Sequence, residues 1–137
     1  MASKKKSVAV VPEPNFGNEK LKISFEYYDS ASSKYCLSKF EKDQVREALL
    51  RLRDINGKSY MELYRQRDHY HFHQVNWKDT EEKNGFPPCG VNEFDPFQIA
   101  LHNVNEWKVR VFGGIHKGTF YIVWFDLEHE IDPSMRR

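Results

Sequence analysis

The sequence contains few cysteines and no long apolar segment. Its 137 residues include two cysteines, Cys36 and Cys89, which do not form a Cys-x-x-Cys motif. This pattern disfavours a disulfide framework and favours reduced thiols in a cytosolic protein. The apolar run at residues 8–11 is too short for the core of a signal peptide, and no stretch approaches the length that crosses a bilayer. We therefore expect a cytoplasmic protein with no membrane partner.

Motifs that mark several common enzyme classes are also missing. The chain has no Gly-x-Gly-x-x-Gly, Walker loop, His-Glu-x-x-His or Gly-x-Ser-x-Gly. Gly113 and Gly114 are adjacent within a strand pattern, which indicates a β-bulge or a close backbone approach rather than a phosphate loop. These absences disfavour nucleotide-dependent and hydrolase functions.

A strong excess of positive charge is the third thing the chain lacks. The net charge is +1, and residues 20–135 contain 16 Lys or Arg against 18 Asp or Glu. The charge is nevertheless unevenly distributed. Residues 34–67 contain nine basic and five acidic residues, whereas residues 76–106 contain two and six. Such a layout can orient a polyanion or a complementary partner, and a solvated surface explains it equally well.

The aromatic content is high, at 15%, and supports a single packed core. We expect a flexible N-terminal tail at 1–19, one α+β domain at 20–131 and a C-terminal tail at 132–137. Period-two alternation predicts strands at 21–27, 70–77, 97–101, 107–115 and 119–127, with a long loop at 78–95. The last three strands are joined by connections short enough for antiparallel hairpins. The order is strand, helix, helix and four strands, with two helices on one face of a mixed or antiparallel sheet.

Two capping-box patterns place the helices. Ser38 with Glu41 predicts the start of a first helix, and Gly57 stands where that helix would end. Ser59 with Glu62 predicts the start of a short second helix, so the pair forms a helical hairpin. A stripe of basic residues along the first helix is either a solvated face or a phosphate-binding track. Our candidate nucleic-acid contacts are Lys39, Lys42, Arg46, Arg53 and, on a later strand, Lys108.

Three histidines alternate along the second predicted strand. His69, His71 and His73 would point to one face of that strand, where neutral imidazoles could hold a divalent metal. A metal site would need a further ligand from a distant residue. Surface or general acid–base histidines are the simpler interpretation.

The last third of the chain supplies residue types that suit RNA cleavage without a metal. Such a reaction needs a base, an acid and a cation for the phosphate, and histidine and arginine provide these. Arg110 lies mid-strand on the face opposite the aliphatic residues, where it could bind a phosphate or form a structural salt bridge with Asp126 or Glu128. The other candidates are His102, Tyr121 and His129.

The strand sequences Phe97-Gln-Ile-Ala-Leu, Trp107-Lys-Val-Arg-Val-Phe-Gly-Gly-Ile and Thr119-Phe-Tyr-Ile-Val-Trp-Phe-Asp-Leu-Glu-His resemble the RelE/ParE-like toxin superfamily, including its bacterial and prophage-encoded members. The resemblance implies a helical hairpin on a curved, mostly antiparallel sheet of about five strands. It implies a metal-independent endoribonuclease that needs no cofactor, with an antitoxin protein and mRNA on the ribosome as possible partners. Arg110 matches the phosphate-contacting strand arginine of that family, and Tyr121 and His129 are looser matches. The acidic residues at 126, 128 and 130 differ from the basic character of these toxins.

Three functions follow as hypotheses. The first is a toxin-like endoribonuclease of a toxin–antitoxin system that uses Arg110. The second is a noncatalytic module that binds protein or nucleic acid through the same fold. The third is a metal-dependent enzyme built on the histidines at 69–73. The oligomeric state is left open.

Overall fold

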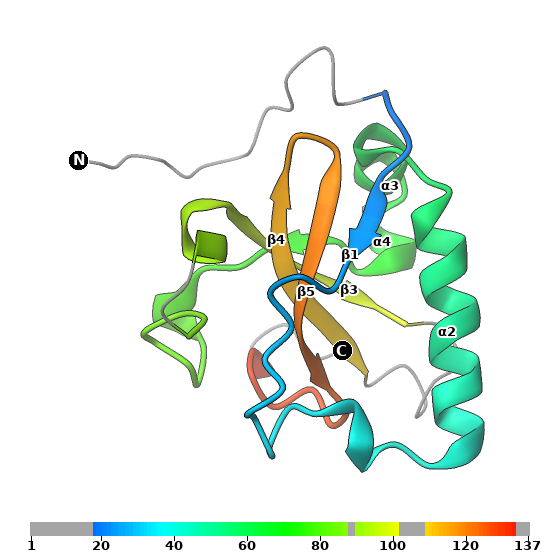
Figure 1. The fold of residues 1–137 in the computed structure, drawn as a ribbon. Coiled ribbons are helices and arrows are strands. Elements are labelled where there is room, and N and C mark those ends of the chain that lie inside the picture. The colour runs from blue at the N-terminus through cyan, green and yellow to red at the C-terminus, as the bar shows by residue number, and fades with distance from the viewer. Residues whose placement is uncertain (1–17, 88–89, 102–108, 134–137) are drawn as a thin grey trace.

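A computed structural model describes residues 18–87, 90–101 and 109–133. Within these ranges five strands form one sheet in the order β1-β5-β4-β3-β2 (Figure 1). β1 runs parallel to β5, and the other neighbouring strands are antiparallel. The strands are β1 Lys22–Ser24, β2 His73–Gln74, β3 Asp95–Ala100, β4 Arg110–His116 and β5 Thr119–Asp126. The α+β class and the mostly antiparallel sheet are confirmed.

Three α-helices are described, namely α2 Lys42–Asn56, α3 Tyr60–Arg65 and α4 Arg67–Tyr70. The predicted capping box of α3 is confirmed. The Ser59 hydroxyl accepts a hydrogen bond from the backbone amide of Glu62, and the Glu62 carboxylate accepts one from the backbone amide of Ser59. Gly57 ends α2 as predicted. The predicted start of α2 is wrong, since a short 3-10 helix, η1 Leu37–Lys39, occupies that position. Glu41 with Gln44 forms the capping box of α2 instead.

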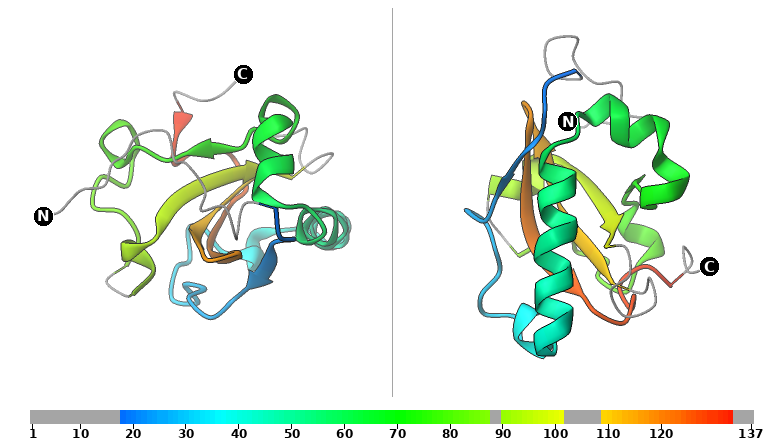
Figure 2. Two further views of the ribbon diagram at one scale, coloured as in Figure 1. Left: turned by 90° about the horizontal axis from the view of Figure 1, so that it is seen from above. Right: turned by 90° about the vertical axis from the view of Figure 1, so that its right-hand side faces the viewer.

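One face of the sheet packs against the helices, and α2 runs along this side (Figure 2). Ala48, Leu52 and Ile55 are the buried residues of α2. These positions are four and three residues apart, so they lie on one side of α2 and form a single buried stripe. They join an apolar cluster that includes the strand residues Phe97, Ile99, Val111, Phe120, Ile122 and Phe125.

The opposite face of the sheet is covered by irregular segments. In Figure 1 residues 77–87 lie on the other side of β4 and β5 from α2. Phe112, Val123 and Trp124 of the sheet are buried there. They pack with Tyr35, Val75, Phe86, Val91 and Ile131. Both faces of the sheet are therefore buried.

A β-bulge at Gly113 adjusts the register of β4 against β5. Phe112 pairs with Trp124, but Gly113 pairs with Ile122, so one residue of β5 is skipped. A Cβ atom on Gly113 would lie 2.1 Å from the carbonyl oxygen of Tyr121. The position therefore excludes side chains, and the sequence-based interpretation of a bulge with close backbone approach is confirmed.

The predicted strand at 70–77 is mostly wrong. Its first residue ends α4, and His71 adopts a left-handed conformation with φ 50° before the two-residue β2. Tyr70 and Phe72 are buried on the helix side, as their alternation suggests, but a helical turn and a reversal place them there. The predicted strand at 21–27 is likewise shorter, at three residues.

The folded structure extends into the predicted C-terminal tail at 132–137. Asp132 is buried, and its Oδ2 accepts a hydrogen bond of 2.8 Å from Nε2 of Gln98. Residues through Asp132 therefore belong to the folded body. Most of the predicted N-terminal tail lies outside the described residues, while Lys20 forms a bridge with Ser59.

Candidate functional site

Arg110 is buried rather than exposed to solvent. Only 3% of its surface is exposed, and its Nη1 donates a hydrogen bond of 3.3 Å to the carbonyl oxygen of Val109. It pairs with Asp126 across the β4–β5 ladder. Burial lowers the pKa of Arg110 to about 10, and the negative charge of Asp126 opposes that shift. Arg110 therefore does not face solvent in this structure, and its role as a phosphate-binding residue stays a prediction.

Asp126 organises the turn that follows β5. Its carboxylate accepts hydrogen bonds from the backbone amides of Glu130, at 2.9 Å, and Ile131, at 2.7 Å. Burial raises the pKa of Asp126, whereas these two hydrogen bonds and Arg110 favour its charged form. Asp126 therefore ties the C-terminal segment to the sheet in a structural role.

The other predicted catalytic residues do not assemble an open site. His129 is buried in the turn after β5 and adopts φ 57°. Tyr121 is half-buried and packs against Tyr27 and Phe94. Tyr121 and Asp126 are five residues apart on β5, so their backbone positions are separated by about 17 Å along the strand, and Asp126 is the residue that pairs with Arg110. His102 lies outside the described residues.

The predicted basic stripe is accessible. Lys39 lies in η1, and Lys42, Arg46 and Arg53 project from α2, all of them exposed. This placement fits both a solvated helix face and a nucleic-acid contact. Lys108 lies outside the described residues.

The three histidines do not share one face of a strand. His69 is exposed on α4, His71 ends that helix, and His73 lies on β2. The rings of His71 and His73 are 6.4 Å apart. Across the described ranges, no group of three or more His, Cys, Asp or Glu residues is placed to hold a metal ion. The geometry assumed for the metal-dependent hypothesis is therefore wrong.

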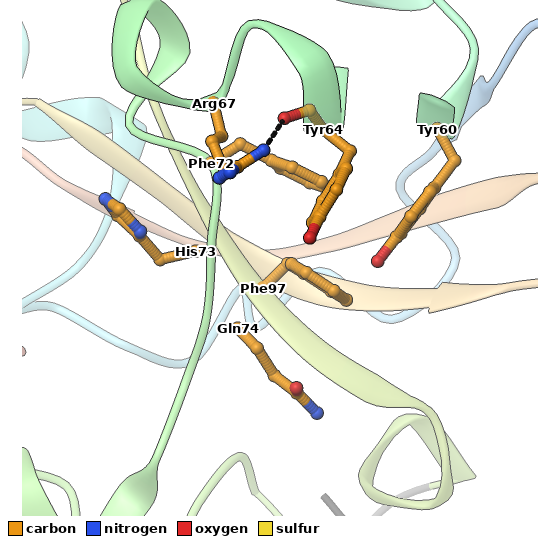
Figure 3. A pocket seen from close by; sticks show the side chains of 7 residues that line it. All are labelled: Tyr60, Tyr64, Arg67, Phe72, His73, Gln74 and Phe97. Atoms are coloured by element: carbon orange, nitrogen blue, oxygen red, sulfur yellow. Dashed lines mark hydrogen bonds between the residues drawn. The ribbon is translucent and has the colours of Figure 1, made fainter. Parts of the chain in front are cut away.

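An aromatic pocket that the sequence reasoning missed opens between α3, β2 and β3 (Figure 3). Its volume is about 190 Å³. The Ser59 capping box starts α3 at Tyr60, so Tyr64 follows one helical turn later on the same side. The lining residues are Tyr60, Tyr64, Arg67, Phe72, His73, Gln74 and Phe97. The spacing of the two tyrosines and the following arginine is the signal that could have found it.

The pocket has parallel aromatic walls. The rings of Tyr60 and Tyr64 are inclined by 10°, with centroids 6.4 Å apart, and their hydroxyl groups point toward Phe97 (Figure 3). Tyr60 is 5% exposed, whereas Tyr64 is 41% exposed. Behind them, Phe72 and Phe97 stack at 4.7 Å. These surfaces are suited to a planar ligand group.

Polar groups border the same pocket. The guanidinium carbon of Arg67 lies 4.4 Å from the ring centroid of Tyr64, and Nη1 of Arg67 donates a hydrogen bond of 2.7 Å to the Tyr64 carbonyl oxygen. Burial, with Asp95 and Tyr64 nearby, raises the pKa of Tyr60 to about 12. The Tyr60 phenol is therefore neutral at physiological pH.

No family model, curated protein or solved structure matches this chain. Within the described ranges the longest helix, α2, has 15 residues, and no helix there has both the length and the apolar character to cross a bilayer.

Proposed function

We propose that this protein is a noncatalytic binding module whose ligand-contacting site is the aromatic pocket. The observation that carries the proposal is the contrast between this accessible pocket and the buried position of Arg110. A group that is 3% exposed does not reach an external substrate, whereas the ring of Tyr64 does.

The residue types in the pocket support a binding role. Tyrosine and arginine supply much of the energy at binding sites, because they combine large contact areas with polar groups. The volume of about 190 Å³ is below the usual range for drug-sized ligands, so it suits one planar group of a larger partner.

The proposal is tested by substituting the exposed wall of the pocket. The immobilised wild-type protein, Tyr64→Ala and Phe25→Ala are incubated with host extract, and each retained protein or nucleic acid is identified and rebound in purified form. Phe25 is a matched control, because it is also an exposed aromatic residue, at 51%, and lies outside the pocket. We expect a partner that binds wild type and Phe25→Ala but not Tyr64→Ala. A partner retained equally by all three proteins, or none at all, would contradict the proposal.

The toxin-like, metal-independent endoribonuclease stays a second candidate. The mixed five-stranded sheet with helices on one face is compatible with the arrangement expected of the RelE/ParE-like superfamily. Cleavage through Arg110 would require its buried guanidinium to become exposed. Labelled RNA incubated with the purified protein and with Arg110→Lys tests this: cleavage by wild type alone supports it, and intact RNA in both reactions contradicts it. An antitoxin, mRNA and a cytoplasmic location stay predictions of this candidate.

A further inference from the structure

We propose that the outer edge of β2 binds an extended segment of a partner protein, which adds a strand to the sheet and places one aromatic side chain in the aromatic pocket. The proposal rests on the binding function above and specifies the partner. Three features of the described residues carry it: the direction of the β2 backbone groups, the contrast with the other edge of the sheet, and the position of the pocket beside β2.

The pairing of β2 with β3 determines where the backbone groups of this edge strand point. Gln74 lies opposite Phe97, and the amide of Val75 donates a hydrogen bond of 2.9 Å to the carbonyl oxygen of Pro96. Hydrogen-bonded and non-hydrogen-bonded positions alternate along an antiparallel pair, so Gln74 takes a non-hydrogen-bonded position. Its N–H and C=O therefore point away from β3, and within the described residues no strand lies on that side of β2.

The same edge continues at Asn76. Its backbone is extended, with φ −107° and ψ 102°, so its N–H points to the same side as that of Gln74. The carbonyl oxygen of Asn76 accepts a hydrogen bond of 3.0 Å from the amide of Asp79. The edge thus presents a donor and an acceptor at Gln74 and a further donor at Asn76. This sequence of groups is complementary to the backbone of an extended peptide.

The other edge strand of the sheet, β1, is covered where β2 is not. The amide of Leu21 donates a hydrogen bond of 2.7 Å to the carbonyl oxygen of Lys58. The amide of Ile23 donates one of 3.0 Å to Oδ1 of Asn56, the last residue of α2. Proteins usually cover or block strand edges, because unpaired backbone groups there pair readily with another chain. Among the described residues, only the edge at β2 therefore offers its outward backbone groups to a partner.

The aromatic pocket lies beside this edge. Gln74 borders the pocket and also a second hollow that is lined by Asn76. The Gln74 amide is directed away from the aromatic rings (Figure 3). Residues directly opposite each other on neighbouring strands project to the same face, and Phe97 belongs to the helix-side cluster. A partner residue opposite Gln74 would project to this face too, where the exposed ring of Tyr64 forms one wall of the pocket.

The charge and size of the pocket favour a peptide side chain over a polyanion. The charged residues around it are of both signs, namely Glu62, Arg65, Arg67, Asp68 and Asp95. Binding of a nucleic acid depends on concentrated positive charge, which this balance does not supply. The volume of about 190 Å³ is small for a drug-sized ligand but suits one side chain. Because the walls are aromatic, an aromatic side chain gains edge-to-face or offset contacts there.

The test selects peptides from a displayed library of random segments of about eight residues, using the immobilised full chain. The enriched peptides are synthesised, and fluorescence anisotropy measures their affinity for wild type, Tyr64→Ala, Gln74→Pro and two controls. Gln74→Pro removes the outward N–H, and proline is accepted on an edge strand at such a position. Gln74→Ala is its matched control, because it keeps the N–H. Phe25→Ala is the control for Tyr64→Ala, since Phe25 is exposed and lies outside the pocket. Circular dichroism checks the folding of each variant.

We expect the enriched peptides to share one aromatic residue within an alternating strand-like pattern. Tyr64→Ala should weaken their binding by about tenfold or more, because the aromatic side chain loses a wall of its pocket. Gln74→Pro should weaken binding by about threefold to tenfold, the effect of one lost hydrogen bond. Gln74→Ala and Phe25→Ala should bind like wild type.

A second measurement changes the peptide instead of the protein, so it holds even if Gln74→Pro does not fold. Methylation of a backbone nitrogen removes its N–H, and in a paired strand only alternate N–H groups face the neighbouring strand. We expect methylation at alternate peptide positions to weaken binding by about tenfold or more, and methylation at the positions between them to leave it nearly unchanged.

Three results would overturn the proposal: no enriched peptide, equal binding by wild type and folded Tyr64→Ala, or N-methylation without an alternating effect. A wild-type dimer that Gln74→Pro converts to a monomer in sedimentation would also overturn it, since a second copy of the chain would then occupy the edge. If the peptides fail while a captured partner still depends on Tyr64, the binding function stands without strand pairing. If nothing that binds depends on Tyr64, both proposals fail.

Discussion

The two faces of the sheet are both buried, but different forces hold their covers in place. On the helix face, α2 and α3 contribute an apolar cluster in which Leu63 and Ile99 are fully buried. The opposite face contains buried aromatic residues and also a polar cluster. The members of this cluster are at most 4% exposed, namely Gln98, Arg110, Asp126, His129 and Asp132. Apolar packing tolerates small adjustments, whereas buried charges need their partners in place. The second face is therefore the one more sensitive to single changes.

The largest expected effect tests the polar cluster. Asp126→Ala removes the negative charge beside Arg110 and leaves two backbone amides without their acceptor. We expect a loss of about 3–5 kcal/mol in the free energy of unfolding, because the buried guanidinium of Arg110 loses this negative charge. Urea denaturation measures this, with the exposed neighbour Glu128→Ala as control, whose expected change is within about 0.5 kcal/mol. Equal effects of the two variants would remove the contrast between the faces.

The helix face should respond according to the volume removed. Ile99→Ala deletes most of a fully buried side chain, so we expect a loss of about 2–5 kcal/mol in the free energy of unfolding. Ile99→Val, which removes one methylene, should cost about 0.5–1.5 kcal/mol. Denaturation of both variants in urea gives the two values. A large loss of unfolding free energy in Ile99→Val would mean that this face is as sensitive to single substitutions as the polar face.

The polar cluster should also respond to pH. Arg110→Met is expected to cost about 1–3 kcal/mol at neutral pH, because Asp126 keeps its two amide hydrogen bonds. Arg110 opposes the rise that burial causes in the pKa of Asp126, so its removal raises that pKa further. When the pKa of a carboxyl group is higher in the folded state than in the unfolded state, protonation stabilises the fold. This stabilisation is complete below the unfolded-state pKa and is lost as the pH rises through the folded-state pKa.

The cost of Arg110→Met should therefore be smaller at about pH 4 than at neutral pH. Urea denaturation of wild type and variant across this range measures the difference in their free energies of unfolding. A difference that stays constant with pH would show that the charge of Asp126 is not coupled to Arg110.

The smallest effect concerns a hydrogen bond at the edge of the second face. The hydroxyl of Tyr35 donates a hydrogen bond of 2.5 Å to Oε2 of Glu82, and burial together with Glu82 raises the pKa of Tyr35. Tyr35→Phe keeps the ring on Trp124 and removes the hydroxyl, so we expect a loss of about 0.5–1.5 kcal/mol in the free energy of unfolding. Thermal unfolding of Tyr35→Phe and Glu82→Gln compares the two partners. If neither variant changes the unfolding temperature, the hydrogen bond between Tyr35 and Glu82 does not contribute to stability, and packing alone stabilises this region.

Local patterns predicted the elements whose signals lie close together in the chain. Alternation placed β3 to β5 within a few residues, and Ser59 with Glu62 identified the start of α3. The bulge at Gly113 was also predictable, because glycine in a strand has few other uses. In each case the physical cause lies within a few residues of the observed feature.

Features that depend on distant segments could not be predicted. The burial of Arg110 depends on segments that cover its face of the sheet, and the left-handed turn at His71 broke the expected alternation of the three histidines. The aromatic pocket requires α3 to meet β2 and β3, which are adjacent only after the sheet forms. The separate roles of Tyr60 and Tyr64 likewise appear only from their different exposure.

The parallel pairing of β1 with β5 has a consequence for synthesis of the chain. Lys22 lies opposite Thr119, a separation of 97 residues. At a translation rate of about 5–20 residues per second, the first strand leaves the ribosome roughly 5–20 seconds before its neighbour exists. During that interval Ile23 and Leu21 cannot reach their final places beside β5, so the nascent protein carries an unfinished edge. That edge stays without its neighbouring strand until β5 has been synthesised.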